Sequence, residues 1–320
     1  MVSKYKIAVI IPYFGKWPVW SDLFFYSCMQ NSDIDYFFYT DCEIPEFVKK
    51  ENAKNVHFSI TSFREYCEKV SQRLNIYFHP QNAYKLCGLK PFYGYIHYED
   101  IKNYDFWGFG DLDLVYGRIR HFYTDEILEK YDLFSTHSDR VSGHLFLMRN
   151  NDYYRTICFQ LPKWKEKLCS NKMIGLDEGE LTVKLRPYTP AFWGVRRAVR
   201  RMLKWKKEAI FFNGVMSCIN KFQQNYTKQY FVEQFTTPIL YDEMTGWEEP
   251  NTDWAYINGM IINMTTGKEH IYFHFMSYKR NMYYSKSYWK DDFYHLDGEH
   301  FNNIKIGKNG FDYLETNEKD

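Results

Sequence analysis

Four short apolar segments within the first 110 residues restrict the fold of this chain more than any other feature. They cover residues 5–12, 35–40, 56–60 and 105–110. The first, YKIAVIIP, is a continuous run rich in β-branched residues that ends in a proline, as expected of a buried parallel strand. Helix-like segments separate the apolar runs, and strands that alternate with helices indicate an α/β fold. We therefore predict a doubly wound, mostly parallel, Rossmann-like sheet.

Helices are expected between these strands. Pro18 suits the first turn of a helix that runs to about residue 30, and Thr61 is expected to cap a helix that ends near residue 74. Further along the chain, residues 145–148 are expected to form a strand and residues 150–160 a helix.

The last quarter of the chain is less regular. Two apolar segments, residues 256–264 and 269–275, are joined by a Thr-Thr-Gly turn, which predicts a hairpin or a pair of strands. The sequence turns polar after Phe301, and we expect that tail to fray. We predict one compact core with a C-terminal elaboration.

Composition excludes several classes of function. Hydrophobic residues make up 45% of the 320 residues, enough for a packed core, and the net charge of +1 argues against a nucleic-acid binder. The seven cysteines form no CxxC pair, so neither a disulfide framework nor a zinc site is indicated, and reduced thiols fit a cytoplasmic protein. We expect no signal peptide and no membrane span, because no apolar run approaches the required length.

The sharpest local signal is the acidic pair Asp111 and Asp113 in the sequence FWGFGDLDLVYG. The pair follows the fourth apolar segment, and ligands of open α/β sheets bind at the carboxyl ends of strands. Two carboxylates two residues apart can hold one hard cation, and Mn²⁺ or Mg²⁺ bound this way keeps positions free for a diphosphate. We predict a metal site at Asp111 and Asp113.

A second segment, HIYFHFMSYKR at residues 270–280, complements the acidic pair. His274 ends an apolar run and is followed closely by Lys279 and Arg280. A neutral imidazole can complete a metal shell, and the cations can neutralise diphosphate oxygens. A core histidine beside a basic turn is the alternative interpretation.

With these motifs, the chain resembles GT-A-type glycosyltransferases. The resemblance rests on IAVIIPYFG, on Thr40-Asp41, on GDLDLVYG and on HFMSYKR, and it spans roughly residues 5–280. More narrowly, the chain is similar to a bacterial family of DxD proteins found with capsule and cell-surface polysaccharide genes. The resemblance implies a nucleotide-sugar fold, Mn²⁺ or Mg²⁺, and a diphosphate leaving group.

Matched by position, the resemblance assigns Asp111 and Asp113 to metal and ribose contacts. It makes His274 the late metal ligand and Lys279 the phosphate-binding lysine. The related HxxGxxK pattern has a glycine where this chain has Ser277, and its lysine comes one position later. The phosphate role could therefore fall to Arg280.

Six residues nearer the N-terminus are candidate donor contacts: Pro12, Tyr13, Phe14, Asp41, Lys85 and Lys90. The first three follow the first strand, where such folds seat the nucleotide base. Asp41 could accept a hydrogen bond from uracil or ribose, or could be an ordinary turn cap. One of the two lysines could touch the diphosphate, or both could be solvated.

An acidic pair later in the chain could supply the catalytic base. An inverting transferase needs a carboxylate opposite the donor to take the acceptor's proton, and Asp177 is the first choice, with Glu178 second. An acidic pair at a helix N-terminus is the alternative. His144, at the start of GHLFLMRN, is a candidate sugar contact.

The segment from Arg196 to Lys207 is strongly basic and carries Trp205 among apolar residues. A basic amphipathic helix of this kind suits an anionic membrane surface, which predicts peripheral association with the inner face of the membrane. A solvated helix or a loop over the active site is the alternative.

These observations predict a cytoplasmic, metal-dependent glycosyltransferase. It would move a sugar from a nucleotide-sugar, with UDP favoured because the resembled families mostly use it, to a saccharide or lipid-linked saccharide acceptor of surface polysaccharide synthesis. We expect residues 1–280 to form the catalytic domain, including the basic segment 194–207, and residues 281–320 to form a C-terminal extension. The alternatives are a nucleotidyltransferase or phosphodiesterase, and a non-catalytic sugar-binding relative.

Overall fold

The computed structural model describes most of the chain. The described residues are 3–172, 174–186, 218, 221–222, 224, 226–234, 236–237, 253–279, 289, 292–298 and 300–314. The basic segment 194–207 and Arg280 lie outside them.

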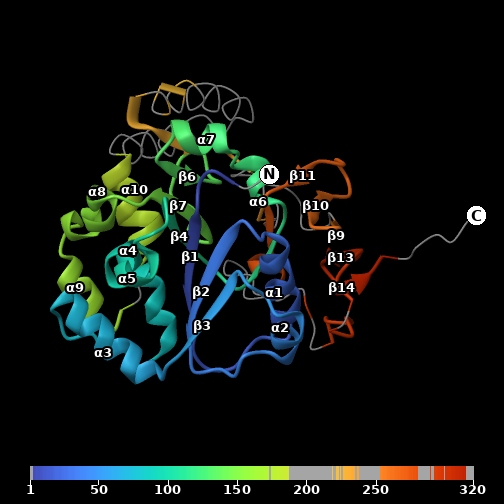
Figure 1. Cartoon of the computed structure of the whole chain (residues 1–320), viewed down its shortest axis with the longest axis horizontal. Coiled ribbons are helices and arrows are strands. Elements are labelled where there is room, and N and C mark those ends of the chain that lie inside the picture. The colour runs from blue at the N-terminus through green and yellow to red at the C-terminus, as the bar shows by residue number, and fades with distance from the viewer. Residues whose placement is uncertain are drawn as a thin grey trace, which may run out of the picture.

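A seven-stranded mixed sheet forms the centre of the molecule, in the order β3-β2-β1-β4-β7-β6-β8 (Figure 1). Its strands are β1 (Ile7–Pro12), β2 (Ile34–Thr40), β3 (Val56–Ile60), β4 (Phe106–Gly110), β6 (Leu133–Ser135), β7 (Leu145–Arg149) and β8 (Gln229–Phe231). Strands β1 to β4 are parallel, whereas β7 runs antiparallel to both of its neighbours. The prediction of an α/β fold with a mostly parallel, Rossmann-like sheet is confirmed.

The sheet is covered on both faces because its inner strands are apolar throughout. Side chains alternate between the faces, so that Ala8 and Ile10 of β1 join one core cluster and Ile7 and Val9 join the other. Helix α1 (Ser21–Gln30) contributes Phe24 and Phe25 to the second cluster. Figure 1 shows α1 and α2 (Glu46–Glu51) on one side of the sheet and α3 (Phe63–Leu74) on the other.

The helix predicted from Thr61 begins one residue later than expected. Ser62 is its N-cap, and its side chain accepts a hydrogen bond from the Glu65 backbone N–H while the Glu65 carboxylate accepts one from the Ser62 N–H. This reciprocal pair is a capping box, which fixes the start of a helix.

Short helical segments connect the remaining strands. They are η1 (Ala83–Phe92), α4 (Tyr93–Ile96), α5 (Tyr98–Ile101), α6 (Ile119–Phe122), α7 (Asp125–Lys130), α8 (Asp152–Thr156), η2 (Ile157–Gln160), α9 (Trp164–Cys169), η3 (Leu176–Leu181) and α10 (Thr182–Leu185). The helix predicted over residues 150–160 is therefore one turn of α-helix followed by a 3₁₀ turn. None of the helices in the described ranges is long and apolar enough to cross a bilayer.

The C-terminal region adds a five-stranded sheet in the order β11-β10-β9-β13-β14. Its strands are β9 (Trp254–Ile257), β10 (Met260–Asn263), β11 (Glu269–His270), β13 (Ile304–Gly307) and β14 (Gly310–Tyr313). The predicted apolar segment 256–264 is divided, because Asn258 (φ 48°) and Gly259 (φ 81°) make a two-residue turn of the kind that joins hairpin strands. The Thr-Thr-Gly turn lies between β10 and β11, which are paired as expected.

The expectation that the tail frays after Phe301 was wrong for residues 304–313. Strand β13 pairs with both β9 and β14, and Ile304, Ile306 and Phe311 are fully buried. The three side chains join the core of the C-terminal sheet, so apolar burial outweighs the polar character of the residues between them.

A two-stranded ribbon links the C-terminal region to the central sheet. Strand β12 (Tyr272–His274) pairs antiparallel with β5 (Leu114–Tyr116), which directly follows the acidic pair, and His274 lies opposite Leu114. The short helix α13 (Met276–Lys279) comes next. His274 and Leu114, 160 positions apart in the chain, are thereby paired just after the carboxyl end of β4.

Candidate functional site

The acidic pair lies where the direction of the sheet's winding changes. From β1 the chain goes outward to β2 and β3 and then crosses back to β4 on the other side of β1. Ligands of open α/β sheets bind in the crevice outside the carboxyl ends of the strands at such a switch point. Asp111 and Asp113 follow β4 there, and Tyr13 and Phe14 follow β1.

Asp113 is enclosed by cationic and imidazole groups from the C-terminal region. Its Oδ2 lies 2.6 Å from Lys279 Nζ, and its Oδ1 lies 3.5 Å from His274 Nε2. The Phe275 backbone N–H donates to the Asp113 carbonyl, which continues the pairing of β12 with β5. Burial alone would raise the pKa of the Asp113 carboxyl, but His274 and Lys279 outweigh it and hold that pKa well below its usual range.

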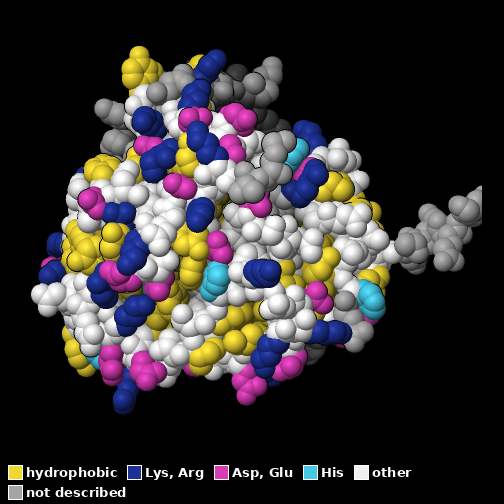
Figure 2. Space-filling model, in the orientation of Figure 1, with side chains coloured by type: hydrophobic (Ala, Val, Ile, Leu, Met, Phe, Trp, Pro, Cys, Tyr) yellow, Lys and Arg dark blue, Asp and Glu magenta, His cyan; other side chains and the backbone are white. Residues whose placement is uncertain are grey.

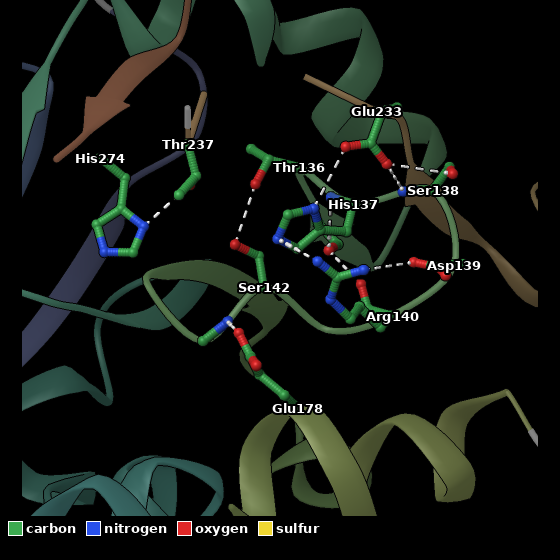
Figure 3. A network of polar contacts seen from close by, with 12 residues as sticks. Thr136, His137, Ser138, Asp139, Arg140, Ser142, Glu178, Glu233, Thr237 and His274 are labelled. Carbon is green, nitrogen blue, oxygen red and sulfur yellow. Dashed lines mark hydrogen bonds and ion pairs between the residues drawn. The ribbon is translucent and has the colours of Figure 1, made fainter. Parts of the chain in front are cut away.

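The pair Asp113 and His274 fits a divalent cation. Oxygen and nitrogen ligands of Mg²⁺ or Mn²⁺ lie roughly 2.1 Å from the metal and about 3 Å from one another. The observed 3.5 Å separation of Asp113 Oδ1 and His274 Nε2 is close to that spacing. The other ring nitrogen, His274 Nδ1, lies 3.0 Å from the Thr237 hydroxyl (Figure 3). This contact fixes the ring with Nε2 3.5 Å from Asp113 Oδ1.

Asp111 has different partners. Lys90 Nζ lies 2.6 Å from Asp111 Oδ1, donates to the Gly143 carbonyl at 2.7 Å, and lies 3.7 Å from Asp177 Oδ2. Burial favours the neutral amine, but Asp111 and Asp177 outweigh it and raise the pKa of Lys90, which stays charged. The structure therefore brings Asp113, His274 and Lys279 together and places Asp111 with Lys90 and Asp177.

Asp177 and Glu178, the candidate bases, lie on η3 beside this lysine. Asp177 is 6% exposed, and burial raises the pKa of its carboxyl although Lys90 opposes the shift. Glu178 is exposed, and its Oε1 accepts a hydrogen bond from the Gly143 N–H at 3.1 Å. A Cβ at Gly143 would lie 2.9 Å from Glu178 Oε1 and 3.0 Å from Asp177 Oδ2, so a glycine is needed for this close approach.

The residues after β1 form a fixed aromatic loop. Pro12 ends β1, and the Tyr13 ring stacks on Trp17 with centroids 5.0 Å apart. Phe14 is buried against Tyr66 and Phe63. Tyr13 is half-buried, so of the three predicted base contacts it offers ring surface that a planar ligand could cover.

Asp41 and Lys85 both have partners elsewhere. Asp41 Oδ1 accepts a hydrogen bond from the Gly15 N–H at 2.7 Å, which fixes the loop after β1. Lys85 Nζ donates to the backbone carbonyls of Lys167 and Lys172. Of the two predicted lysines, the structure brings only Lys90 to the acidic pair.

Two residues at the site were not anticipated from the sequence. Trp20 Nε1 donates to the carbonyl of Leu112, between the two aspartates, at 3.1 Å, and Lys279 Nζ lies 5.2 Å from the centre of the Trp20 ring. Trp20 therefore supports both the acidic turn and the lysine that contacts it. Thr237, which holds His274, is the second residue, and no local pattern marks either of them.

The ring of His144, the predicted sugar contact, packs against both His274 and His137. Its ring stacks on His274 with centroids 4.3 Å apart and lies edge-on to His137 at 5.2 Å. Within the described ranges, one group of three potential ligands has all its ligand atoms within 4.8 Å of one another, namely His137, His144 and Glu178. Sequence analysis named two of these residues but not His137, whose only signal is its place just after β6.

The charges on the face of the molecule shown in Figure 2 are mixed. Lys and Arg side chains are interspersed there with Asp and Glu, and no wide field of one sign covers this face. This view gives no support to a nucleic-acid surface.

Comparison with known families gives one match. The model of a family described as "Family of unknown function (DUF6625)" matches residues 9–311, which is nearly the whole chain. The search of curated proteins found no match.

Proposed function

We propose that this chain, which belongs to the DUF6625 family, is a metal-dependent glycosyltransferase. It would transfer a sugar from a nucleotide-sugar donor to a saccharide or lipid-linked saccharide acceptor in surface polysaccharide synthesis. UDP is the favoured nucleotide because the GT-A-type enzymes that the sequence resembles mostly use it. The proposed setting is the cytoplasm, which agrees with cysteines that form no CxxC pair.

One observation carries the proposal. Asp113, at the switch point of a Rossmann-like sheet, lies within 3.5 Å of His274 Nε2 and 2.6 Å of Lys279 Nζ. A carboxylate and an imidazole offer a divalent cation two ligands, and the ammonium group beside them can contact a diphosphate. Together, the cation and the ammonium group would stabilise the negative charge of a nucleoside diphosphate leaving group.

Asp113 and His274 would hold the cation. A bound Mn²⁺ or Mg²⁺ would offset the negative charge that develops on the leaving diphosphate. Lys279 would turn from Asp113 to the diphosphate oxygens, and its side chain is 32% exposed, which leaves it room to move. Lys90 would stay in place and keep Asp111 directed at the metal's water shell or at the ribose.

Asp177 is the proposed base if the reaction inverts the configuration. Its carboxyl is buried and lies 3.7 Å from Lys90 Nζ, which also contacts Asp111. A carboxylate in such a place can accept the proton of an acceptor hydroxyl as the new bond forms. Glu178 is the second choice.

Nucleotidyl transfer is supported less well. Nucleotidyltransferases with this type of fold usually carry a glycine-rich, basic loop directly after the first strand. The corresponding sequence here is PYFGKWPVW, with a single glycine, and the structure fills it with the packed rings of Tyr13, Phe14 and Trp17. A sugar-binding relative without activity would have no need of the contacts around Asp113.

Peripheral membrane association through residues 196–207 is a further part of the proposal. It would bring the enzyme to a lipid-linked acceptor, and it rests on the basic amphipathic sequence alone. Failure of the purified protein to co-sediment with anionic liposomes at low salt would remove this part and leave the transferase proposal intact.

The test is a release assay with purified full-length protein. Mn²⁺ and a panel of UDP-, GDP- and dTDP-sugars are supplied, and the nucleoside diphosphate set free is measured, with Asp113→Asn as the control. Slow metal-dependent hydrolysis of one donor, absent in the control, would support the proposal and identify the sugar. No release from any donor, together with no Mn²⁺-dependent binding, would favour the sugar-binding alternative.

A further inference from the structure

The loop between β6 and β7 carries His137 and His144, which form a second group of potential metal ligands together with Glu178 of η3. One ring nitrogen each of His137 and His144 and one carboxylate oxygen of Glu178 lie within 4.8 Å of one another. The two histidines are buried and Glu178, on η3, faces them from an exposed position (Figure 3 shows His137 and Glu178). We propose that these three residues form a zinc site, separate from the cation site at Asp113 and His274.

His144 gives independent support for a metal site, because one of its ring nitrogens is buried without a hydrogen-bond partner. The residue is 5% exposed, and its Nε2 is buried with no hydrogen-bond partner. Leaving a buried polar atom without a partner destabilises the folded state. A metal ion would satisfy that nitrogen.

His137 is oriented in the way that metal-bound histidines usually are. Its Nδ1 lies 3.4 Å from Glu233 Oε1, and the other Glu233 oxygen accepts a hydrogen bond from the Ser138 N–H at 3.0 Å. A ligating histidine typically donates its second ring N–H to a carboxylate, which fixes the ring. With Nδ1 held by Glu233, Nε2 is the nitrogen left for a metal.

Glu178 completes the group from the opposite side. The Gly143 N–H holds Oε1, so Oε2 can be offered to a cation. Ligand atoms around zinc lie roughly 3–3.5 Å apart, so the group has to contract by roughly 1.3–1.8 Å from its present upper limit of 4.8 Å. The exposed Glu178 side chain can provide that movement.

Arg140 competes for the same place. Its Nη2 donates to His137 Nε2 at 3.3 Å, while its Nη1 donates to Asp139 Oδ1 at 3.0 Å. A metal at His137 Nε2 would displace the first contact, and Asp139 would retain the guanidinium. Arg140 should therefore weaken metal binding without abolishing it.

The chemistry of the three ligands selects the ion. Two imidazoles and one carboxylate suit Zn²⁺ or Co²⁺ better than Mg²⁺ or Mn²⁺, which prefer sites made of oxygen atoms. Three protein ligands also leave a coordination position open for water or substrate. The site at Asp113, which has more oxygen character once a diphosphate binds, would take a different ion.

The experiment uses the full chain without a histidine tag, stripped of metal, with Asp113→Asn as the background so that the other cation site is removed. Zn²⁺ affinity is measured by competition with a coloured chelator. Four variants are added singly to this background: Glu178→Gln, His137→Gln, Glu233→Gln and Arg140→Gln. Glu180→Gln, on the same short helix and paired with Lys167, is the matched control.

The proposal predicts one bound Zn²⁺ per chain in the Asp113→Asn background. Glu178→Gln and His137→Gln should each weaken it by at least about 100-fold, and Glu233→Gln by about 10–100-fold. Glu180→Gln should leave the affinity unchanged, and Arg140→Gln should raise it. The proposal would be overturned if the background protein did not bind Zn²⁺. It would also be overturned if the Glu178→Gln and His137→Gln variants bound Zn²⁺ as tightly as the background protein does. Neither result depends on whether the chain transfers a sugar.

Discussion

Asp111 and Asp113 are two residues apart and each contacts one lysine at 2.6 Å, yet the two contacts differ in kind. The lysine of Asp111 is Lys90, whose side chain is 7% exposed and which also contacts Gly143 and Asp177. The lysine of Asp113 is Lys279, whose side chain is 32% exposed and which forms an ion pair with Asp113. Lys90 is therefore buried in the protein, whereas Lys279 is partly exposed to solvent.

The difference assigns separate roles to two halves of one motif. A buried ammonium with three oxygen neighbours cannot leave without uncovering two carboxylates, so Asp111 and Lys90 act as a fixed part of the scaffold. Lys279 can leave Asp113 at little cost, because solvent reaches it and His274 remains. We therefore expect Asp113 to exchange its lysine for a cation and Asp111 to keep its lysine.

The largest expected effect is that of Asp113→Asn on activity. It removes the charged ligand that the cation would need, so the rate of donor cleavage should fall at least about a thousandfold. Asp111→Asn should reduce the rate much less. Nucleoside diphosphate release by both variants is the measurement, and equal losses would erase the distinction between the two aspartates.

Lys90→Met should act mainly on stability. Its loss leaves Asp111 and the buried Asp177 without their cation, which should lower the free energy of unfolding by about 3–5 kcal/mol. Urea denaturation measures the change. Lys102→Met is the control, because Lys102 pairs with Glu99 at the exposed surface and its loss should change the stability little. A Lys90 variant as stable as this control would contradict the scaffold role.

Lys279→Met should show the opposite pattern. The free energy of unfolding should change by less than about 1 kcal/mol, because the ion pair is partly exposed. The kcat/KM for the donor should fall by about 10–100-fold, since a charge-assisted contact to the diphosphate is lost. Unchanged kinetics beside reduced stability would show that Lys279, like Lys90, is structural.

Thr237→Val should have the smallest effect. It removes the hydroxyl that lies 3.0 Å from His274 Nδ1 and leaves the shape of the side chain almost unchanged. Loss of such an orienting partner should weaken Mn²⁺ binding by about tenfold, with little effect on folding. Calorimetry of Mn²⁺ binding gives the answer, and an unaltered affinity would mean that His274 needs no orientation from Thr237.

The parallel part of the sheet could be predicted from the sequence because its information is local. Strands β1 to β4 are short apolar runs, and the acidic pair follows one of them directly, so its place at the carboxyl end of that strand could be predicted. The paired strands that bring His274 to Asp113 join residues far apart in the chain. His274 was a candidate from its place at the end of an apolar run and from the resemblance, and only the structure gives its contact with Asp113.

The sequence could not show which of Lys85 and Lys90 contacts the acidic pair. Lys85 and Lys90 lie five residues apart on the 3₁₀ helix η1, and at three residues per turn they point roughly 120° apart around its axis. One side chain therefore reaches Asp111 while the other is fixed by distant carbonyls. Without knowledge of that helix type, the sequence could not choose between them. The sequence did not identify His137 or Thr237 either. Each lies outside the helices and strands, so no periodic pattern indicates which residue it contacts.

The most direct test of the central claim is a calorimetric titration of UDP into the full-length protein, with and without Mn²⁺, for the wild type, Asp111→Asn and Asp113→Asn. We expect UDP to bind the wild type in a Mn²⁺-dependent manner, Asp111→Asn to keep this dependence, and Asp113→Asn to lose it. UDP binding that ignores Mn²⁺, or that survives unchanged in Asp113→Asn, would contradict the assignment of Asp113 as the residue that holds the cation.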